Sequence, residues 1–293
     1  MPPPPPQPTL TNVPYGTHPR QVLDFWKAES KTPTPLVVYI HGGGWWGGTK
    51  EYQDVVDVQK LLDHGISVAA INYRLIPQAV AAGVQPPVQW PIADAARAVQ
   101  FLRSKASEWN IDKTRVGATG TSAGACSSLW LAFHDDLAQP NSPDPIARES
   151  TRLSCAGAYG PQTSLDPKQL REWMPNARYG GHAFGFQRGG RDKDFPRFYE
   201  HREDVLPWIQ QYSPYEHVGP GDPPVYLYFP TQDSPVAAGT VQNDPTHSAV
   251  MGLMLQKKLD QHHIVSYLFY PGHEAKYKDC TEFLIATLKP DSR

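Results

Sequence analysis

Short apolar runs rich in β-branched and aromatic residues alternate along this chain with segments whose apolar residues recur at helical spacing. Strands that alternate with helices pair in parallel, because each helix carries the chain back across one face of the sheet. The pattern therefore predicts an α/β fold, with a mostly parallel central sheet and helices on both faces. The expected strands are residues 36–40, 66–71, 115–119, 153–159, 225–229 and 264–270, and the expected helices are residues 51–64, 91–102, 123–138, 245–260 and 276–288.

The alternation is interrupted at two places. Met1 is followed by five prolines, and we expect residues 1–19 to be a flexible Pro-rich lead ahead of a single domain over 20–293. From about 160 to 220 the chain is dense in aromatic residues, Arg, Gly and Pro, which indicates a cap-like insertion over the functional edge of the sheet. The N-terminus lacks the basic and apolar regions of a secretory signal, so a cytoplasmic protein and a secreted one without its signal both stay open.

Charge and composition exclude several classes of function. With 27 Lys and Arg against 29 Asp and Glu, the chain lacks the basic excess that phosphate binding needs, so nucleic acid is not an expected partner. The apolar runs are far shorter than the roughly 20 residues of a membrane-spanning helix. The three cysteines, Cys126, Cys155 and Cys280, are too widely spaced for a zinc clip, and we expect neither a metal nor a cofactor.

The pentad Gly120-Thr121-Ser122-Ala123-Gly124 lies directly after an expected strand and opens an expected helix. This is the context of a nucleophile elbow, in which a strained turn exposes a serine hydroxyl and side chains at the flanking glycines would collide with their neighbours. A strand-to-helix turn that merely needs glycine is the structural alternative. The pentad makes Ser122 the candidate nucleophile.

A glycine-rich loop, His41-Gly42-Gly43-Gly44-Trp45-Trp46, follows the strand expected at 36–40. Consecutive glycines leave backbone N–H groups accessible to a substrate oxygen. We expect Gly43 and Gly44, together with Ala123 just after the candidate nucleophile, to form an oxyanion hole. A phosphate-binding loop would need Lys and Ser or Thr in an order that the following residues do not supply.

The two glycine motifs together resemble those of α/β-hydrolases of the esterase and lipase group, whose oxyanion loop reads His-Gly-Gly-Gly or His-Gly-Gly-x-Trp. The order of the motifs and the alternation of strands and helices match over most of residues 20–290, and the resemblance is weakest in the insertion at about 160–220. It implies a Ser, acid, His triad in that chain order, no metal, and hydrolysis of carboxylic esters through an acyl-enzyme.

His273 is the expected general base. It lies in a short Pro271-Gly272-His273-Glu274 loop after the last expected strand, from which an imidazole could lean over the sheet edge toward Ser122. The other histidines fit less well: His41 is expected to anchor its loop, and His247 falls in the first turn of the helix expected at 245–260.

Two aspartates compete for the position of the acid. Asp244 precedes an expected helix and resembles the Asp-Pro opening found in the family, although an Asp before Pro is also a good helix N-cap. Asp233 lies four residues after the strand expected at 225–229, the usual position of this acid, or is a turn residue. We favour Asp244 and keep Asp233 as the alternative.

The substrate is less constrained by the sequence than the reaction is. The expected substrate is a small-molecule or carbohydrate ester with a short acyl group of the acetyl or feruloyl type, and Trp45 and Trp46 are expected to line its pocket. The alternatives are an amide or formamide hydrolase with the same triad, resembling kynurenine formamidases, and a noncatalytic binding module on the same scaffold. The oligomeric state stays open.

Overall fold

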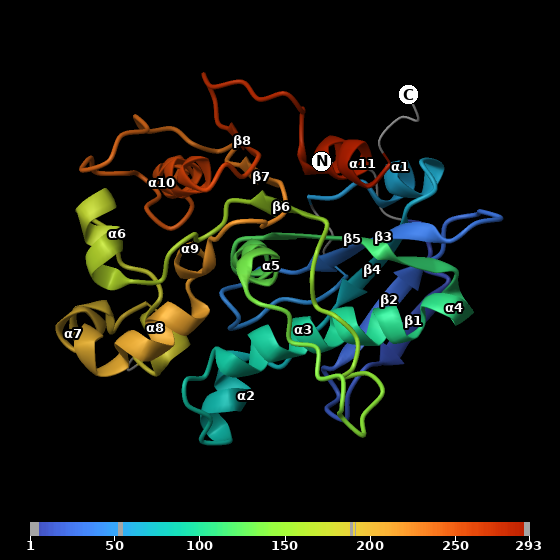
Figure 1. Ribbon diagram of the computed structural model, residues 1–293. Helices are drawn as coiled ribbons and strands as arrows, with labels where there is room; N and C mark the ends of the chain where they lie inside the picture. The colour runs from blue at the N-terminus through green and yellow to red at the C-terminus, as the bar shows by residue number, and fades with distance from the viewer. Residues whose placement is uncertain (1–5, 52–54, 188–189, 191, 290–293) are drawn as a thin grey trace.

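A central sheet forms the middle layer of the protein (Figure 1). The computed structural model describes residues 6–51, 55–187, 190 and 192–289, and within them the sheet has the strand order β1-β2-β4-β3-β5-β6-β7-β8. β1 pairs with β2 and β2 with β4 in antiparallel fashion, and the remaining pairs are parallel. The strands are β1 (Leu10–Pro14), β2 (Val22–Trp26), β3 (Thr34–Ile40), β4 (Ser67–Ile71), β5 (Ile111–Thr121), β6 (Cys155–Tyr159), β7 (Val225–Tyr228) and β8 (Ser266–Phe269).

Helices cover both faces of this sheet. On one face lie α1 (Val58–Asp63) and α11 (Cys280–Leu288), and on the other lie α3 (Gln89–Ser104), α5 (Ala123–Phe133) and α10 (Ala249–Gln261). Figure 1 shows α1 and α11 above the sheet and α3 and α5 below it. This layering buries every position of β3 and β4, which explains why they read as continuous apolar runs.

The side chains of β3 show how the two cores are divided. Leu36, Val38 and Ile40 belong to the core shared with α3, α5 and α10, while Val37 and Tyr39 belong to the core shared with α1 and α11. Successive side chains of a strand point to opposite faces, so one five-residue run supplies both cores.

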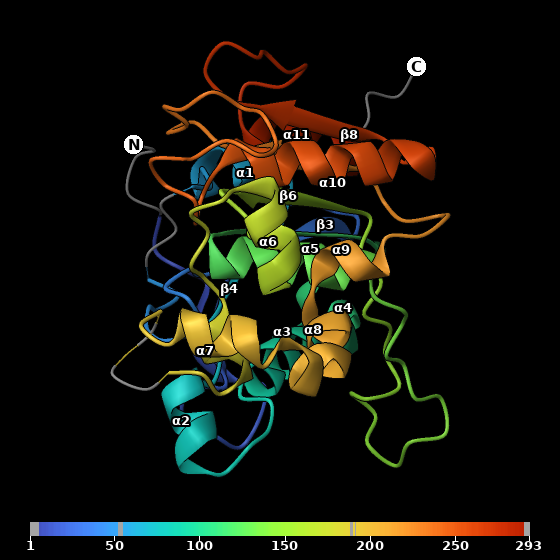
Figure 2. The same cartoon turned by 90° about the vertical axis from the view of Figure 1, so that its left-hand side faces the viewer.

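Short helices fill several connections of the sheet, and in Figure 1 those between β6 and β7 gather on one side, away from α4 (Figures 1 and 2). Most of them lie between β6 and β7, where we expected the insertion, and this segment packs against the start of α3 through a hydrogen bond from Val88 N–H to the carbonyl oxygen of Ala183 (3.1 Å). The short helices are α2 (Ile76–Ala81), α4 (Ala106–Trp109), α6 (Pro167–Trp173), η1 (Gly181–Phe184), α7 (Phe195–Glu200), η2 (Arg202–Val205), α8 (Leu206–Tyr212) and α9 (Pro214–His217).

The predicted α/β fold is confirmed, and the six expected strands lie where the apolar runs placed them. The N-terminal strands β1 and β2 were not predicted from the sequence. The prediction of a flexible lead is therefore wrong for residues 10–14, which form β1, and residues 1–5 lie outside the described residues. The helix expected at 245–260 begins only at Ala249, since the side chain of Ser248 accepts from Val250 N–H (3.1 Å) and caps the helix there.

Two further expectations concern the membrane and the cysteines. Within the described ranges, no helix is long and apolar enough to cross a bilayer. Cys126, Cys155 and Cys280 are separate buried thiols, and burial raises the pKa of each thiol well above its usual value.

The turn between β5 and α5 packs against the end of β3 with no room for side chains. A Cβ added to Gly120 would lie 2.2 Å from the carbonyl oxygen of Ile40, and one added to Gly124 would lie 1.9 Å from the same atom. Because the colliding atom belongs to the backbone of a central strand, it cannot move aside. The two flanking glycines are therefore required by packing, as the elbow motif predicts.

We expect Gly124→Ala to destabilise the fold by about 3 kcal/mol or more, because the added methyl group overlaps the backbone of β3. The matched control is Gly47→Ala, since nothing lies within 4 Å of a Cβ at Gly47; this variant should change stability by less than about 0.5 kcal/mol. Urea unfolding of both variants measures the difference. Equal stability of Gly124→Ala and wild type would contradict the packing argument.

Candidate active site

Ser122 lies at the sharp turn between β5 and α5. Its backbone adopts φ 53° and ψ −117°, a strained conformation for a residue with a side chain. The turn is held by hydrogen bonds from Ser122 N–H to the carbonyl oxygen of Tyr159 and from Cys126 N–H to the carbonyl oxygen of Ser122, both 2.9 Å long. These bonds fix the hydroxyl at the carboxyl end of the central strands, where ligands bind in open parallel sheets.

The hydroxyl of Ser122 meets a histidine and an aspartate from one loop. Ser122 Oγ lies 2.9 Å from His247 Nε2, and His247 Nδ1 lies 2.8 Å from Asp244 Oδ2. A carboxylate only accepts hydrogen bonds, so Nδ1 carries the proton and Nε2 is left to accept from the serine hydroxyl. This is the tautomer that a general base for Ser122 needs.

The carboxylate of Asp244 is suited to remain ionised beside the imidazole. Partial burial raises its pKa, but the hydrogen bond and charge of His247, and the N–H groups of Thr246 and His247, outweigh that effect. The pKa of Asp244 therefore lies below its usual value. The side chain is 60% exposed, so water reaches this carboxylate directly.

The structure does not bring the predicted base to Ser122. His273 pairs with Tyr270 through two backbone hydrogen bonds (2.8 and 3.3 Å), its ring stacks on that of Tyr270, and it is exposed. The strands β6 and β7 separate β8 from β5, which at about 4.8 Å per strand spacing amounts to roughly 14 Å. A turn that closes directly back on Tyr270 does not span that gap.

Of the two aspartates considered, the structure places Asp244 beside the histidine that contacts Ser122. Asp233 is exposed, and its Oδ1 accepts from the hydroxyl of Ser234 at 3.1 Å. The histidine that the sequence reasoning dismissed, His247, lies in a loop because α10 begins later than predicted. The signal that could have identified it is Ser248, a strong N-cap residue immediately after it.

Two glutamines, the buried Gln242 and the half-buried Gln232, shape the loop that carries Asp244 and His247. Gln242 Oε1 accepts from Gln232 Nε2 and from Ser248 Oγ, both at 2.9 Å. Gln232 Oε1 in turn accepts from Ala249 N–H at 2.8 Å, at the start of α10. Asn176 of the insertion accepts from the backbone N–H of Gln242 at 3.1 Å. The loop is thus tied to both the helix that follows it and the insertion.

Gln162 connects this loop to the serine. Its side-chain amide donates to the carbonyl oxygen of Thr246 at 2.7 Å and lies 3.5 Å from Ser122 Oγ. The residue is 1% exposed, so water does not compete for the bond. The contact fixes the backbone just before His247 relative to Ser122.

In the glycine loop after β3, hydrogen bonds to the carbonyl oxygens orient the N–H groups. The carbonyl oxygen of Gly42 accepts from His41 Nδ1 (2.8 Å) and from Tyr73 Oη (3.2 Å), whose hydroxyl is shared with the carbonyl oxygen of His41 (2.8 Å). That of Gly43 accepts from the N–H groups of Trp46 (3.0 Å) and Gly47 (3.2 Å). In a trans peptide each N–H points opposite to the carbonyl before it. These bonds therefore orient the N–H groups that follow, those of Gly43 and Gly44.

Those two N–H groups are not used by the loop itself, and of the two residues Gly43 is exposed and Gly44 buried. In the part of the chain that the structure describes, neither Gly43 nor Gly44 donates a backbone hydrogen bond. Both residues have positive φ, 95° and 65°, and a Cβ at Gly43 would lie 2.5 Å from the carbonyl oxygen of Gly47, so glycine is required there. Ala123 is the first residue of α5, and its N–H has no acceptor within the helix.

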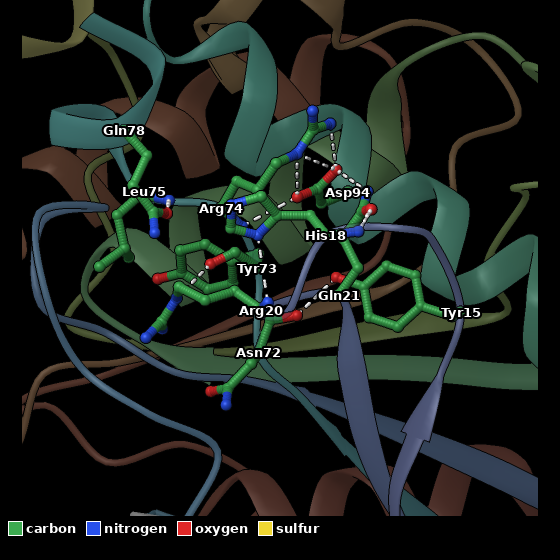
Figure 3. Close-up of polar contacts among 10 residues, drawn as sticks. All are labelled: Tyr15, His18, Arg20, Gln21, Asn72, Tyr73, Arg74, Leu75, Gln78 and Asp94. Carbon is green, nitrogen blue, oxygen red and sulfur yellow. Dashed lines mark hydrogen bonds and ion pairs between the residues drawn. The ribbon is translucent and has the colours of Figure 1, made fainter. Parts of the chain in front are cut away.

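A polar network lies next to His41, the first residue of the loop, and Figure 3 shows the part of it around Arg20, Tyr73 and Asp94. The ring of His41 stacks on that of Tyr73 at 4.1 Å, and Arg20 donates from Nε to the carbonyl oxygen of Tyr73 at 2.8 Å. The neighbouring Arg74 forms an ion pair with the buried carboxylate of Asp94 (2.6 Å). Arg20 comes from the segment between β1 and β2, so the strands that the sequence missed help to support the glycine loop.

The two tryptophans expected to line a substrate pocket, Trp45 and Trp46, differ from each other in burial. Trp45 is fully buried, and its indole N–H donates to Ser127 Oγ at 3.0 Å, so it is a core residue of the loop. Trp46 is half-buried and packs edge-on against His182. Among the described residues, no group of three or more His, Cys, Asp or Glu side chains is arranged to hold a metal ion.

Comparison with known proteins gives sequence matches that each cover about half of the chain. The family model described as BD-FAE matches residues 23–163. Esterase LipC of Mycobacterium tuberculosis is 25% identical over 150 residues, which cover 50% of this chain and 35% of the relative. A probable isoprenylcysteine alpha-carbonyl methylesterase, ICMEL2 of Arabidopsis thaliana, is 32% identical over 127 residues, 43% of this chain and 28% of the relative. The matched segments thus span about a third of the length of these relatives.

Solved structures match over most of the chain. An acetyl ester-xyloside bifunctional hydrolase from Caldicellulosiruptor lactoaceticus is 23% identical with a TM-score of 0.61, and the match covers 85% of this chain and 77% of that one. A truncated carbohydrate esterase from gut microbiota is 18% identical with a TM-score of 0.66, over 89% and 86% of the two chains. At a sequence identity below 25%, these matches show that the proteins share a fold.

The buried histidine of the glycine loop should make stability depend on pH. Burial, aided by the nearby guanidinium of Arg20, lowers the pKa of His41 to about 4, although its bond to Gly42 acts in the opposite direction. The unfolded chain, with a histidine pKa near 6.5, binds more protons than the folded chain between those two values. The free energy of unfolding is therefore highest above about pH 6.5 and should fall by about 3 kcal/mol as the pH drops to 4.

We expect His41→Asn to reduce this dependence, because an amide can still donate to Gly42 and does not titrate. Urea unfolding at pH 7 and pH 4.5 measures it. A variant whose stability changes with pH as much as that of wild type would show that His41 is not the responsible group.

Proposed function

We propose that this chain, which has the predicted α/β-hydrolase fold, hydrolyses carboxylic esters through an acyl-enzyme on Ser122. His247 acts as the general base and Asp244 as the acid of the triad. Gly43, Gly44 and Ala123 donate to the oxyanion. The observation that carries the proposal is the chain of contacts from Ser122 Oγ to His247 Nε2 (2.9 Å) and from His247 Nδ1 to Asp244 Oδ2 (2.8 Å).

The first half of the reaction forms the acyl-enzyme. Ser122 Oγ attacks the carbonyl carbon of the ester while its proton passes to His247 Nε2. The negative charge that develops on the carbonyl oxygen is received by the N–H groups, each of which stabilises the transition state by roughly 2.7–4 kcal/mol. When the intermediate collapses, the bond to the alcohol oxygen breaks and His247 gives its proton to the leaving alcohol.

The second half repeats these steps with water. His247 takes a proton from a water molecule that attacks the acyl carbon, and the same N–H groups receive the second oxyanion. Collapse releases the carboxylic acid and returns the proton to Ser122 Oγ. In both halves Asp244 stabilises the imidazolium and fixes the tautomer, without itself taking the proton.

For the substrate we propose esters with short acyl groups, including acetyl or feruloyl groups on a carbohydrate. The names of the similar structures, an acetyl ester-xyloside hydrolase and a carbohydrate esterase, support an acylated sugar. The names of the sequence relatives, an esterase and a methylesterase, support ester over amide cleavage.

Wild type is expected to hydrolyse chromogenic acetyl esters and to release acetate from acetylated xylo-oligosaccharides, with far lower rates on anilides of the same acyl groups. Ser122→Ala should lose turnover by at least about 10³-fold while keeping its fold, because the nucleophile is absent. Steady-state kinetics and labelling of Ser122 by a fluorophosphonate test this. Labelling that persists in Ser122→Ala, or faster cleavage of the anilide, would contradict the proposal.

Paired variants distinguish the histidines and the aspartates. His247→Ala should lower kcat by about 10³-fold or more, whereas His273→Ala should leave kcat within about threefold. Asp244→Asn should lower kcat by on the order of 10²-fold, less than for a buried triad acid, because water at this exposed site partly replaces the carboxylate. Asp233→Asn is the matched control and should have little effect. The reverse ranking within either pair would overturn the assignment.

A further inference from the structure

His182 is a buried histidine that the proposed reaction does not use. It lies in η1, within the insertion between β6 and β7, and is 0% exposed. Its Nε2 lies 2.9 Å from the carbonyl oxygen of Gly44. A carbonyl oxygen only accepts, so Nε2 carries a proton and donates it to this bond. The insertion thereby contacts the backbone of the glycine loop directly.

The imidazole of His182 is held in place from several sides. The rings of Tyr179, Trp46 and Trp45 surround it at centroid distances of 5.1, 6.3 and 6.4 Å. The other ring nitrogen, Nδ1, lies 3.3 Å from Asp192 Oδ1 but makes no hydrogen bond there, so the support comes from the rings and from the backbone of η1. The next residue of η1, Ala183, accepts from the N–H of Val88 at the start of α3. The donor therefore reaches Gly44 from a rigid support.

Gly44 needs such support because its own backbone restricts it little. It has φ +65° and no side chain, so both of its dihedral angles can rotate unless the flanking peptides are held. The peptide before it is held by the bonds from Trp46 and Gly47 to the carbonyl oxygen of Gly43. The peptide after it is held at its carbonyl oxygen by His182. Gly44 is thus fixed between two anchored peptides.

We propose that His182 is a positioning residue for the oxyanion hole, and that through it the insertion keeps the N–H of Gly44 directed at the oxyanion. This inference rests on the proposed ester hydrolysis. It assigns to the insertion a part in the chemical step, besides any part in covering the substrate. Since His182 acts through Gly44 and touches no reacting atom, its loss should lower kcat and leave KM nearly unchanged.

The test compares two variants of His182. His182→Leu keeps an apolar side chain but removes the donor, whereas His182→Gln keeps an amide N–H close to the position of Nε2. We expect His182→Leu to lower kcat for a short acetyl ester by about 10- to 100-fold, with KM within about threefold. A trifluoromethyl ketone, which binds as an oxyanionic hemiketal on Ser122, should bind more weakly by a similar factor. His182→Gln should recover kcat to within about fivefold of wild type.

A packing variant of the same insertion provides the control. Phe198 is fully buried and stacks on Phe184 of η1 at 5.5 Å, and its other ring contacts, with Phe186 and Phe195, also lie within the insertion. Phe198→Leu should lower the melting temperature without lowering kcat more than about threefold. A folded His182→Leu with wild-type kcat, an equal loss of kcat in Phe198→Leu, or no recovery in His182→Gln would each overturn the proposal.

Hydrogen exchange separates this inference from the proposed function. The amide groups of Trp46 and Gly47, which close the turn, should exchange faster in His182→Leu than in wild type and be unchanged in Phe198→Leu. Wild type that cleaves no ester would overturn the proposed function alone, because the exchange measurement still reports whether His182 holds the loop. Unchanged exchange in His182→Leu would overturn the positioning role whatever the activity.

Discussion

The geometry of the candidate site depends on how closely the turn between β5 and α5 packs against the end of β3. With glycine at 120 and 124, the carbonyl oxygen of Ile40 fits between the turn and the helix, where an added Cβ would lie within 2.2 Å of it. β3 runs directly into the glycine loop, and a Cβ at Gly42 would lie 2.8 Å from the carbonyl oxygen of Thr121. One backbone contact therefore places both Ser122 and the N–H groups beside it.

The acid and the base are set by a second, more local constraint. Asp244 and His247 are three residues apart in one loop, and Asp244 also accepts from Thr246 N–H at 3.0 Å. Their mutual orientation is therefore determined within the loop, and Gln162 links the loop to Ser122 in addition to the contact between His247 and Ser122. The loop after β8 carries no such role in this arrangement, which leaves it free to close as a short turn on Tyr270.

The sequence predicted those parts of the fold and the site whose cause is local. Apolar runs located the six central strands, because such strands are buried on both faces, and the glycine pentad located Ser122, because a tight turn demands glycine. The N-terminal strands β1 and β2 were not predicted, since they form the antiparallel end of the sheet, three of the five residues of β1 are Thr, Asn or Pro, and Asp24 interrupts the apolar run of β2. His247 was not identified as the base, because the helix was predicted to begin at residue 245 and begins at Ala249. That difference of four residues placed a loop histidine in a helical turn.

The support of the glycine loop could not be predicted, because it comes from segments far apart in the sequence. Tyr73 follows β4 and holds the carbonyl oxygen of Gly42, while His182 belongs to the insertion and holds that of Gly44. Both donors are fully buried, so water does not compete for their bonds. Because protein donors occupy the carbonyl groups, the N–H groups of the loop remain free to bind a developing anion. They are already oriented, so no free energy is spent on reorienting them when the charge appears.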